Sequence, residues 1–441
     1  MTLVINNVSL PSRKDNKQQL CTVICKDSQI DEIIYGPSDL PIDSPDVVNG
    51  NGDARLCHSH VHLDKCNILD ECDELVSGSF QEALELTSKV KASYTYESLV
   101  SRGRHLIVES IKYGVTAMRA HVEVDRTVQF KGLDAGLRLK EEFKDLCDIG
   151  LAVFAQDPFF ISPSDTEPSD NYILFQKAAG RQGISAVGSA PYVEPSTLHA
   201  RRNIDYVFEL ALENRLHIDF HLDYNLDPNA SPMIHYVIDL ARKSRWTERM
   251  KGKHITIGHA PRLCLFTPEE FKQLQDAIDD LPITFVGLPQ TDMYMLGREE
   301  HIKPRGTLHV PNMVKKYGLN VAMSINNIGN AFTPQGSADP LALCAFGVAI
   351  FQTGLPNDCE ILFDSVSNTS KRAVGVRCGE SLVIRKGDPA DLIIVHGNNS
   401  IQSLVLSPSF ERTVIKNGRV ISSRRIIDVI DPTSFLLGHL M

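Results

Sequence analysis

The sequence predicts an α/β protein, a (β/α)8 TIM-like barrel with a small β-sandwich domain formed from both chain termini. Three observations support this prediction. The middle of the chain alternates apolar strand-like runs with helical patterns, such runs number eight, and both ends are rich in β-branched residues. We expect the small domain to comprise residues 1–53 and 379–441, and the barrel to comprise residues 54–378.

The small domain is expected from short strand signals at the two ends of the chain. Residues 3–8 and 20–35 are apolar or alternating, and a polar stretch separates them. Strand signals return after about residue 379, and the run Lys416–Arg419 places Asn-Gly between two β-branched segments. Asn-Gly at such a position is a strong hairpin signal. One domain that contains both ends of the chain is the simplest interpretation.

The barrel is expected from eight strands, each followed by a helical segment. The strands are expected at residues 54–64, 115–125, 149–156, 186–194, 216–224, 254–260, 283–289 and 320–327. The helices are expected at residues 78–110, 132–147, 201–214, 232–244, 267–280, 306–317 and 340–354. An open doubly wound sheet is the alternative, but no G-x-G-x-x-G follows the first strand and eight repeats favour a closed barrel.

Composition excludes several classes of function. The 441 residues carry 45 basic and 55 acidic side chains, a net charge of −10, which argues against a nucleic-acid partner. No apolar run approaches the roughly 18 residues of a spanning helix, and no signal-peptide pattern is visible, so we expect no membrane association and a cytoplasmic location. The ten cysteines form no C-x-x-C pair and are expected to be free thiols.

Histidines at the end of the first barrel strand predict a metal site. His58, His60, His62 and Asp64 alternate along this segment, so all four side chains point to one face of the strand. Two imidazoles two residues apart can bind one metal ion, and Asp64 could orient them. Active sites of such barrels lie at the carboxyl ends of the strands, which favours a ligand role over a structural one.

Two further strands end in histidine. His221 follows the apolar run of the fifth strand, and His259 ends the sixth. Each of these side chains alone could be a structural core residue. Three strand ends that carry histidine at the same face of the barrel together favour a site for one divalent ion.

The chain resembles the amidohydrolase superfamily, and specifically its cytosine-deaminase-like branch, from about residue 3 to 425. H-x-H alone is modestly specific, whereas the ordered set of motifs is highly specific for the fold. The segments that carry the resemblance are HVHLD (60–64), RAHVEVD (119–125), FAQD (154–157), VGSAPYVEP (187–195), IDFHLD (218–223), TIGHA (256–260), the FVGLP run that continues to Arg298, GDPADLIIV (387–395) and VIKNGRVI (414–421).

This resemblance implies a mononuclear Zn²⁺ or Fe²⁺ centre that activates a water molecule. The implied ligands are His60, His62 and His221. His259 is the implied contact to the metal-bound water or substrate, and Gln156 is the implied reader of an amide-like substrate edge. Binuclear members bridge two metal ions with a carboxylated lysine of the fourth strand or an equivalent acid. Residues 186–194 contain no lysine, which favours one metal ion.

Two positions depart from the family pattern. The glutamate that shuttles protons, three residues after the fifth-strand histidine, is replaced by Tyr224, and the eighth-strand aspartate is replaced by Asn326. An asparagine carbonyl can ligate a metal weakly but cannot act as a base. A phenol with a pKa near 10 is a poor shuttle at neutral pH. Both proton-transfer groups of the deaminase mechanism are therefore missing.

Two hypotheses remain. In the first, the protein hydrolyses a C–N bond of a small cyclic or amide substrate, with altered proton-transfer residues. Asp223 is the foremost candidate base because it shares a strand face with His221, and Asp64 and Glu123 are the other candidates. Arg298 is expected to contact substrate. In the second, the protein is catalytically silent and binds a small ligand or a partner. Zinc deaminases of the cytidine type are excluded, since H-x-E with P-C-x-x-C is absent. Superfamily members often self-associate, so a homo-oligomer stays open.

Overall fold

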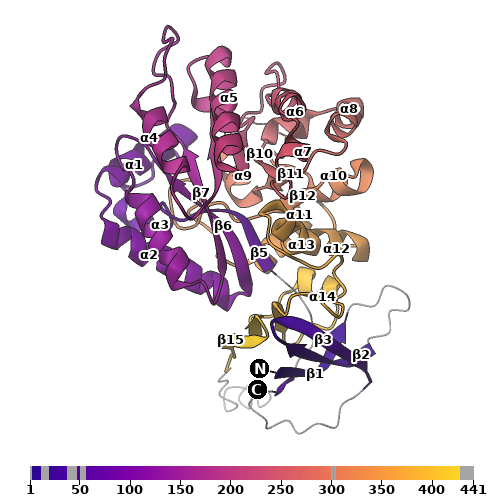
Figure 1. The fold of residues 1–441 in the computed structure, drawn as a ribbon. Coiled ribbons are helices and arrows are strands. Elements are labelled where there is room, and N and C mark those ends of the chain that lie inside the picture. Colours follow the sequence, from indigo (N-terminus) through magenta and orange to yellow (C-terminus); the bar gives the residue numbers. More distant parts are fainter. Residues whose placement is uncertain are drawn as a thin grey trace, which may run out of the picture.

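The computed structural model describes residues 2–10, 19–36, 47–49, 56–298, 301 and 304–427. The described chain forms a barrel with two small sheets beside it, which confirms the predicted fold class (Figure 1). The predicted boundary between residues 53 and 54, and the last residues 428–441 of the predicted small domain, lie outside the described residues. The second boundary, between residues 378 and 379, stays a prediction.

The barrel wall is one parallel sheet of eight strands in chain order. These strands are β5 (Leu56–His62), β6 (Val115–Glu123), β7 (Asp148–Ala155), β8 (Ile184–Ser189), β9 (His217–Leu222), β10 (Ile255–His259), β11 (Ile283–Gly287) and β12 (Val321–Met323). Most of their residues are buried on both faces, and this is why they read as continuous apolar runs.

The barrel closes between its first and last strands. The backbone N–H of His62 donates to the carbonyl of Asn326 at 2.9 Å, and the N–H of Asn326 donates to the carbonyl of His60 at 3.2 Å. Val61 and Asn326 form a parallel bridge, so the pairing continues beyond the short strand β12. Closure therefore places Asn326 directly beside the histidines of β5.

Helices surround this wall. The α-helices are α1 (Phe80–Ala92), α2 (Tyr96–Lys112), α3 (Lys131–Glu142), α4 (Asp170–Ala179), α5 (Thr197–Asn214), α6 (Ile234–Lys243), α7 (Trp246–Arg249), α8 (Pro268–Ile278), α9 (Pro289–Met295), α10 (Val310–Tyr317), α11 (Pro340–Ile350), α12 (Pro356–Ser365), α13 (Asn368–Ala373) and α14 (Ile401–Leu406). Short 3₁₀ helices are η1 (Leu69–Glu71), η2 (Pro191–Val193) and η3 (Pro261–Leu265).

The helix predicted over residues 78–110 is two helices in the structure. Thr95 caps the second one, because its hydroxyl accepts from the N–H of Ser98 and the Ser98 side chain completes a capping box. The predicted strand 186–194 ends at Ser189, where η2 begins with a proline that has no N–H to donate. Helices α4, α7, α9, α12, α13 and α14 were not predicted.

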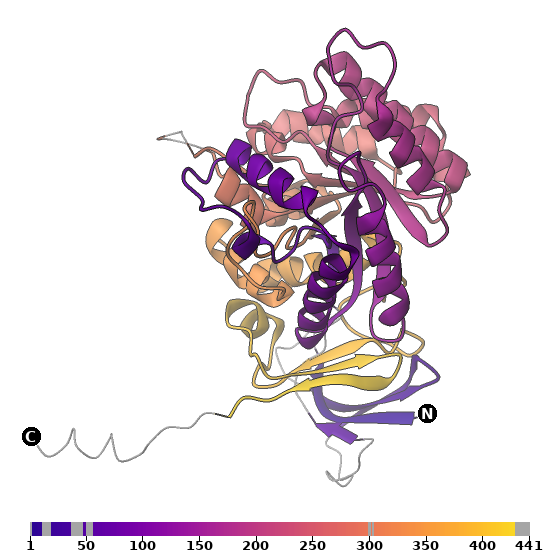
Figure 2. The same cartoon turned by 90° about the vertical axis from the view of Figure 1, so that its left-hand side faces the viewer.

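The small domain brings together strands from both ends of the chain in two separate sheets (Figure 2). One sheet has the order β3-β2-β1-β4, and the other has the order β13-β14-β15. Apolar side chains of both sheets form one core cluster. The strands are β1 (Thr2–Leu10), β2 (Gln19–Lys26), β3 (Gln29–Tyr35), β4 (Val47–Asn49), β13 (Leu392–Val395), β14 (Arg412–Lys416) and β15 (Arg419–Arg424).

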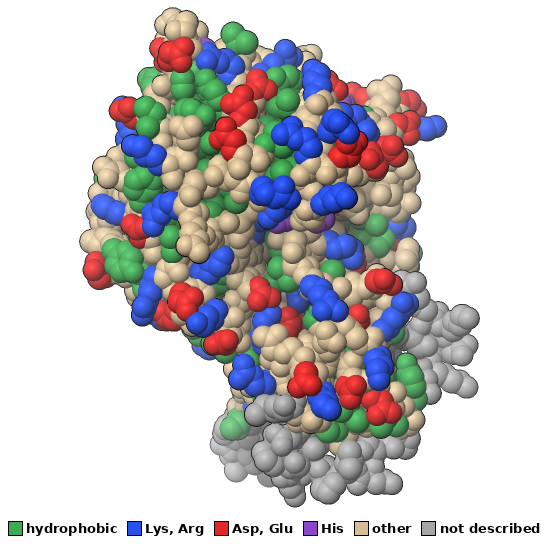
Figure 3. All heavy atoms as spheres, in the orientation of Figure 1, with side chains coloured by type: hydrophobic (Ala, Val, Ile, Leu, Met, Phe, Trp, Pro, Cys, Tyr) green, Lys and Arg blue, Asp and Glu red, His purple; other side chains and the backbone are tan. Residues whose placement is uncertain are grey.

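The Asn-Gly hairpin is confirmed. Lys416 pairs with Arg419, and Asn417 and Gly418 have φ angles of 51° and 70°, as a type I′ turn requires. Seven of the ten cysteines are free thiols, namely Cys57, Cys66, Cys72, Cys147, Cys264, Cys344 and Cys359. Among the described helices, none has the length and apolarity needed to cross a membrane. Acidic and basic side chains are interspersed on the face shown in Figure 3.

Candidate metal centre and active site

Three imidazoles from two barrel strands converge at the carboxyl end of the barrel. His60 and His62 lie on β5, and His221 lies on β9 across the barrel. The Nε2 atom of His221 is 3.0 Å from Nε2 of His60 and 2.9 Å from Nε2 of His62. All three side chains are buried. The structure thus brings together the three side chains that the family resemblance implied as ligands.

This arrangement fits a metal ion. Tetrahedral ligands with Zn–N bonds of about 2.0–2.1 Å lie roughly 3.3 Å apart, close to the separations seen here. Burial lowers the pKa of His60 to about 3 and the pKa values of His62 and His221 well below their usual range, so the rings are neutral and present lone pairs. One hydrogen on His221 cannot satisfy both neighbouring nitrogens well, whereas a shared cation can.

A buried carboxylate supports the ligands from the layer below. Asp219 lies two residues before His221 on the same face of β9, and its Oδ1 is 3.5 Å from Nδ1 of His60 and 3.2 Å from Nε2 of His121. Its Oδ2 accepts from Arg119 at 3.1 Å. Burial alone would raise the pKa of Asp219, but the adjacent imidazoles hold it well below its usual range. With Nδ1 of His60 facing this carboxylate, Nε2 is left to bind metal.

His60, His121, Asp219 and His221 could also be considered as one ligand group, since each has a ligand atom within 4.8 Å of the others. The contacts of Asp219 favour a supporting role, because His60, His121 and Arg119 already face both of its oxygens. Neither Asp219 nor His121 was singled out from the sequence. The period of two along β9 and the RAHVEVD segment were the signals that could have identified them.

A glycine makes room for the His60 ring. A Cβ atom on Gly258 of β10 would lie 2.9 Å from Cε1 and 3.0 Å from Nδ1 of His60. The chain therefore needs glycine before His259, and this explains the Gly-His pair at the end of β10.

His259 lies at the same end of the barrel and is held by an acid that the sequence analysis did not identify. Its Nδ1 is 2.7 Å from Oδ1 of Asp292, which is fully buried on α9. The hydroxyl of Thr307 donates to Oδ2 of Asp292 at 2.8 Å. Because the carboxylate accepts the hydrogen on Nδ1, Nε2 of His259 is left as an acceptor. In the same way, the aspartate of a Ser-His-Asp triad fixes the orientation and tautomer of the catalytic imidazole.

Asn326 is fixed with its oxygen free. Its Nδ2 donates to the hydroxyl of Thr291 at 3.0 Å, and that hydroxyl is 2.6 Å from the hydroxyl of Thr333. The buried Oδ1 has no hydrogen-bond partner among the described residues. An orphaned amide oxygen beside the histidines of β5 can serve as a weak ligand to a metal ion.

Aromatic side chains form the wall of the pocket above the three histidines. Tyr224 packs its ring against His259 at 4.7 Å and against Phe80 at 5.3 Å, and Tyr192 lies 5.6 Å from Tyr224. Burial raises the pKa of Tyr224 well above its usual value, so the phenol stays protonated. Its buried hydroxyl has no partner in the described structure. Tyr224 can therefore donate a hydrogen bond to a ligand, but it cannot act as a base.

Gln156 and Lys65 complete the lining of this pocket, which also includes Asn327 and Phe332. The Nζ of Lys65 donates to Glu123 at 2.9 Å and lies 5.2 Å from the Phe332 ring. Burial would raise the pKa of Glu123, but Lys65 and Lys91 lower it to about 2. Glu123 is thus a permanent counter-ion and does not serve as a proton acceptor.

The structure does not bring two of the predicted residues into the pocket. Asp223 follows the end of β9 with a φ of 51°, which turns its carboxylate away to accept from the N–H groups of Met233 and Ile234 at 2.7 and 3.2 Å. The period of two that suggested a face shared with His221 ends at Leu222. Arg298 is exposed and donates to the carbonyl of Tyr294 at 2.8 Å.

Comparisons with known proteins agree with this architecture. No protein-family model matches the chain. The chain is 25% identical over 434 residues to the N-isopropylammelide isopropyl amidohydrolase of Pseudomonas sp. (strain ADP), covering 96% of this chain and 98% of the relative.

Solved structures show the same fold over the whole chain. The 5-methylcytosine deaminase of Klebsiella pneumoniae, liganded with 5-fluorocytosine, superposes with a TM-score of 0.85 at 22% identity, covering 98% of this chain and 100% of that one. The zinc complex of atrazine chlorohydrolase TrzN from Arthrobacter aurescens TC1 has a TM-score of 0.65 at 13% identity, covering 99% and 98%. The resemblance indicated by the sequence motifs is confirmed.

Proposed function

We propose that this chain, a cytosine-deaminase-like amidohydrolase by its motifs and fold, hydrolyses an exocyclic C–N bond of a small nitrogen heterocycle at one metal ion. The observation that carries the proposal is the convergence of three neutral imidazoles, with Nε2 atoms about 3 Å apart, at the base of a pocket that His259 also lines. One hydrogen on Nε2 of His221 can be donated to only one of the two neighbouring Nε2 atoms, whereas a shared cation would satisfy all three.

The metal would be bound by His60, His62 and His221, with Oδ1 of Asn326 as a weak fourth ligand. Imidazole and amide donors suit Zn²⁺ and Fe²⁺ equally, and no thiolate lines the pocket. A single ion is favoured, because the contacts of Asp219 hold it below the three ligands. When bound, such an ion supplies a water molecule whose pKa is lowered toward neutrality.

Proton transfer is assigned to His259 in place of the missing glutamate and aspartate. Nε2 of His259 can accept a proton from the attacking water and return it to the leaving amine, while Asp292 stabilises the imidazolium. The phenol of Tyr224 can donate a hydrogen bond to a ring nitrogen or oxygen of the substrate. Asp223, whose carboxylate faces Met233 and Ile234, has no part in this step.

The substrate is a planar ring with an amide-like edge and an amino or alkylamino group. Aromatic walls stack on planar rings, and the side chain of Gln156 supplies one donor and one acceptor. The space left in the pocket is about 20 Å³. Phe80 and Phe332, whose rings meet at 5.7 Å over the pocket, must therefore separate to admit the ring. The relatives named for N-isopropylammelide and 5-methylcytosine act on rings of this kind.

The seven free thiols suit a reducing compartment, and for that reason we also propose a cytoplasmic location. A small molecule is the partner that the pocket supports. Analytical sedimentation of the purified chain would distinguish a monomer from a homo-oligomer.

The first test is metal content and turnover. Protein purified without chelators should contain close to one equivalent of zinc or iron, and it should release ammonia or alkylamine from cytosine, 5-methylcytosine or N-isopropylammelide. The double variant His60→Ala/His62→Ala should lose both the metal and the activity, whereas the exposed control pair His105→Ala/His235→Ala should keep them.

Less than about a tenth of an equivalent of metal in the native protein would overturn the proposal. Full retention of metal by the His60→Ala/His62→Ala variant would show that the site is misplaced. Native protein that holds its metal and binds these heterocycles, but turns over none of them, would establish the silent ligand-binding alternative.

A further inference from the structure

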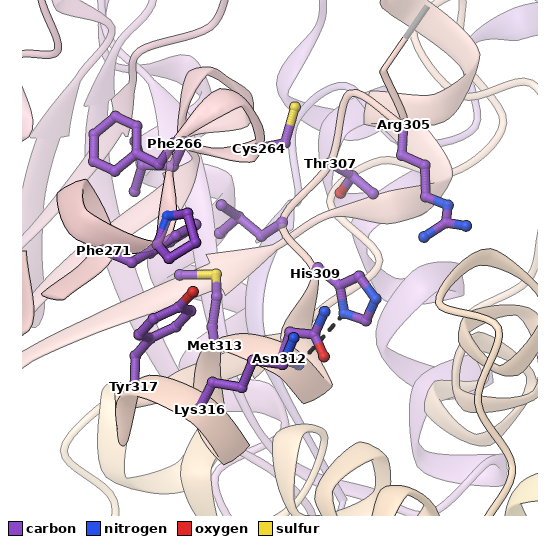
Figure 4. A pocket seen from close by; sticks show the side chains of 13 residues that line it. Cys264, Phe266, Phe271, Arg305, Thr307, His309, Asn312, Met313, Lys316 and Tyr317 are labelled. Atoms are coloured by element: carbon purple, nitrogen blue, oxygen red, sulfur yellow. Dashed lines mark hydrogen bonds between the residues drawn. The ribbon is translucent and has the colours of Figure 1, made fainter.

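A second cavity of about 350 Å³ lies on the outer side of the barrel, between η3, the start of α8, and α10 (Figure 4). None of its lining residues lines the pocket above the three histidines. Thr307 lies between the two pockets. It lines the outer cavity, and its hydroxyl donates a hydrogen bond to Asp292. The outer cavity is therefore a separate site, and its lining residue Thr307 contacts Asp292, the residue that holds His259.

The inner part of this cavity is apolar and aromatic. The rings of Phe271 and Tyr317 stack at 4.7 Å with an angle of 17°, and Phe266 meets Phe271 edge-on at 5.5 Å. Leu308 and Met313 are both 1% exposed and contribute to the lining. Figure 4 shows Met313 between the side chains of Phe271 and Tyr317 on one side and His309 on the other. Such a lining accepts a flat apolar group.

The outer part of the cavity is basic. Arg305 and Lys316 are exposed lining residues, and among the residues that the structure describes no aspartate or glutamate lines the cavity. Arg305 uses one N–H to donate to Gln352 at 2.6 Å, which fixes the side chain and leaves other donors available. The nearby acid Asp358 accepts from Lys315 at 2.7 Å. The side chains of Arg305 and Lys316 thus provide a positive edge to which a carboxylate can bind.

We propose that this cavity is a second small-molecule site, which binds an aromatic monocarboxylate with its ring against Phe266, Phe271 and Tyr317 and its carboxylate at Arg305 and Lys316. The volume lies at the lower end of the range of small-molecule pockets, roughly 300–1,000 Å³, and suits a ligand of one or two fused rings. The lack of acidic lining residues favours an anion over a neutral or cationic ligand.

The test measures binding of 2-naphthoate and of its neutral counterpart 2-naphthamide to the full chain by calorimetry. Naphthoate should bind about tenfold more tightly than the amide. The double variant Arg305→Gln/Lys316→Gln should reduce this ratio to near one. The control Lys243→Gln/Lys251→Gln, which removes two exposed lysines elsewhere, should leave it unchanged. The metal-site variant His60→Ala/His62→Ala should still bind naphthoate, because the carboxylate does not use the metal.

A second measurement does not depend on variants. Cys264 lines the cavity and is half-buried, so saturating naphthoate should slow its alkylation several-fold, while the half-buried Cys72 and Cys378 outside the cavity react as before. No saturable binding, equal affinity for acid and amide, or unprotected Cys264 would each overturn the proposal. Protection of Cys264 that instead rises with protein concentration alone would also overturn it and would identify a second copy of the chain as the occupant.

Discussion

Replacement of Asp292 by Asn tests whether His259 carries the proton. The side chain is fully buried, and an amide of the same shape can still meet Nδ1 of His259 and the hydroxyl of Thr307. A hydrogen bond to a charged group contributes about 1.5–3 kcal/mol, which corresponds to roughly 10- to 150-fold in rate. If the amide nitrogen turns toward Nδ1, the imidazole hydrogen moves to Nε2 and the base is lost, an effect that reaches about 10⁴-fold in serine proteases. We expect kcat to fall by about 10²- to 10³-fold.

The assay follows amine release at saturating substrate, together with metal content and KM. Because Asp292 contacts no proposed ligand of the metal, metal content and KM should stay near the native values. The control Thr307→Val keeps the charge and removes one hydrogen bond, so it should lower kcat by no more than about tenfold. A loss of less than about fivefold in Asp292→Asn, with metal retained, would refute the assignment of His259 as the proton carrier.

Three further predictions concern stability and the metal. Arg412→Met leaves the fully buried Asp339 unpaired and should lower the free energy of unfolding by about 3–5 kcal/mol, whereas Arg104→Met, at an exposed pair, should cost less than about 1 kcal/mol in the same denaturant titration. Burial lowers the pKa of His217 from 6.5 to about 2, so only the unfolded chain takes up this proton as the pH falls from 6.5, and stability declines. His217→Gln should make that decline shallower by about one proton, and an unchanged slope would contradict the assignment. Asn326→Asp adds a carboxylate ligand and should slow metal loss to a chelator by about tenfold or more, and an unchanged rate would remove residue 326 from the ligand set.

The barrel was predictable because each strand is buried on both faces. A largely apolar run such as Ile283–Gly287 reflects that burial directly in the sequence. The residues at which helices and strands begin and end were harder to predict from the sequence. The break at Thr95 depends on a capping box. Asn326, the third residue after β12, joins the barrel wall through backbone hydrogen bonds that no sequence pattern indicates.

The candidate site was predictable where function coincides with strand ends. His60, His62, His221 and His259 follow apolar runs, and parallel strands deliver their carboxyl ends to one face. Asp292 could not be found in this way, because it lies on a short helix after β11 and reaches His259 only through the fold.

Asp223 is the opposite case, a residue that sequence spacing placed in the site and the structure places outside it. Its spacing from His221 predicted a shared face, but the strand ends at Leu222 and a φ of 51° redirects the carboxylate to Met233 and Ile234. A period of two holds only inside the strand, and a single left-handed residue cancels it. The end of a strand is therefore the place where periodicity is least reliable.

The loss of two family acids at Tyr224 and Asn326 and the presence of Asp292 beside His259 both change the charge of the site. A metal ion with three neutral imidazoles keeps its full positive charge, and an amide at Asn326 does not reduce it. Such an ion would acidify water more strongly than one with a carboxylate ligand, so a weaker base than the family's acids would suffice at this site. Asp292 would supply the negative charge that the amide of Asn326 lacks. Its carboxylate contacts Nδ1 of His259, so it would strengthen His259 as a proton acceptor without binding the metal itself. Tyr224, neutral and set among Phe80 and Tyr192, makes the pocket less polar than a glutamate at this position would.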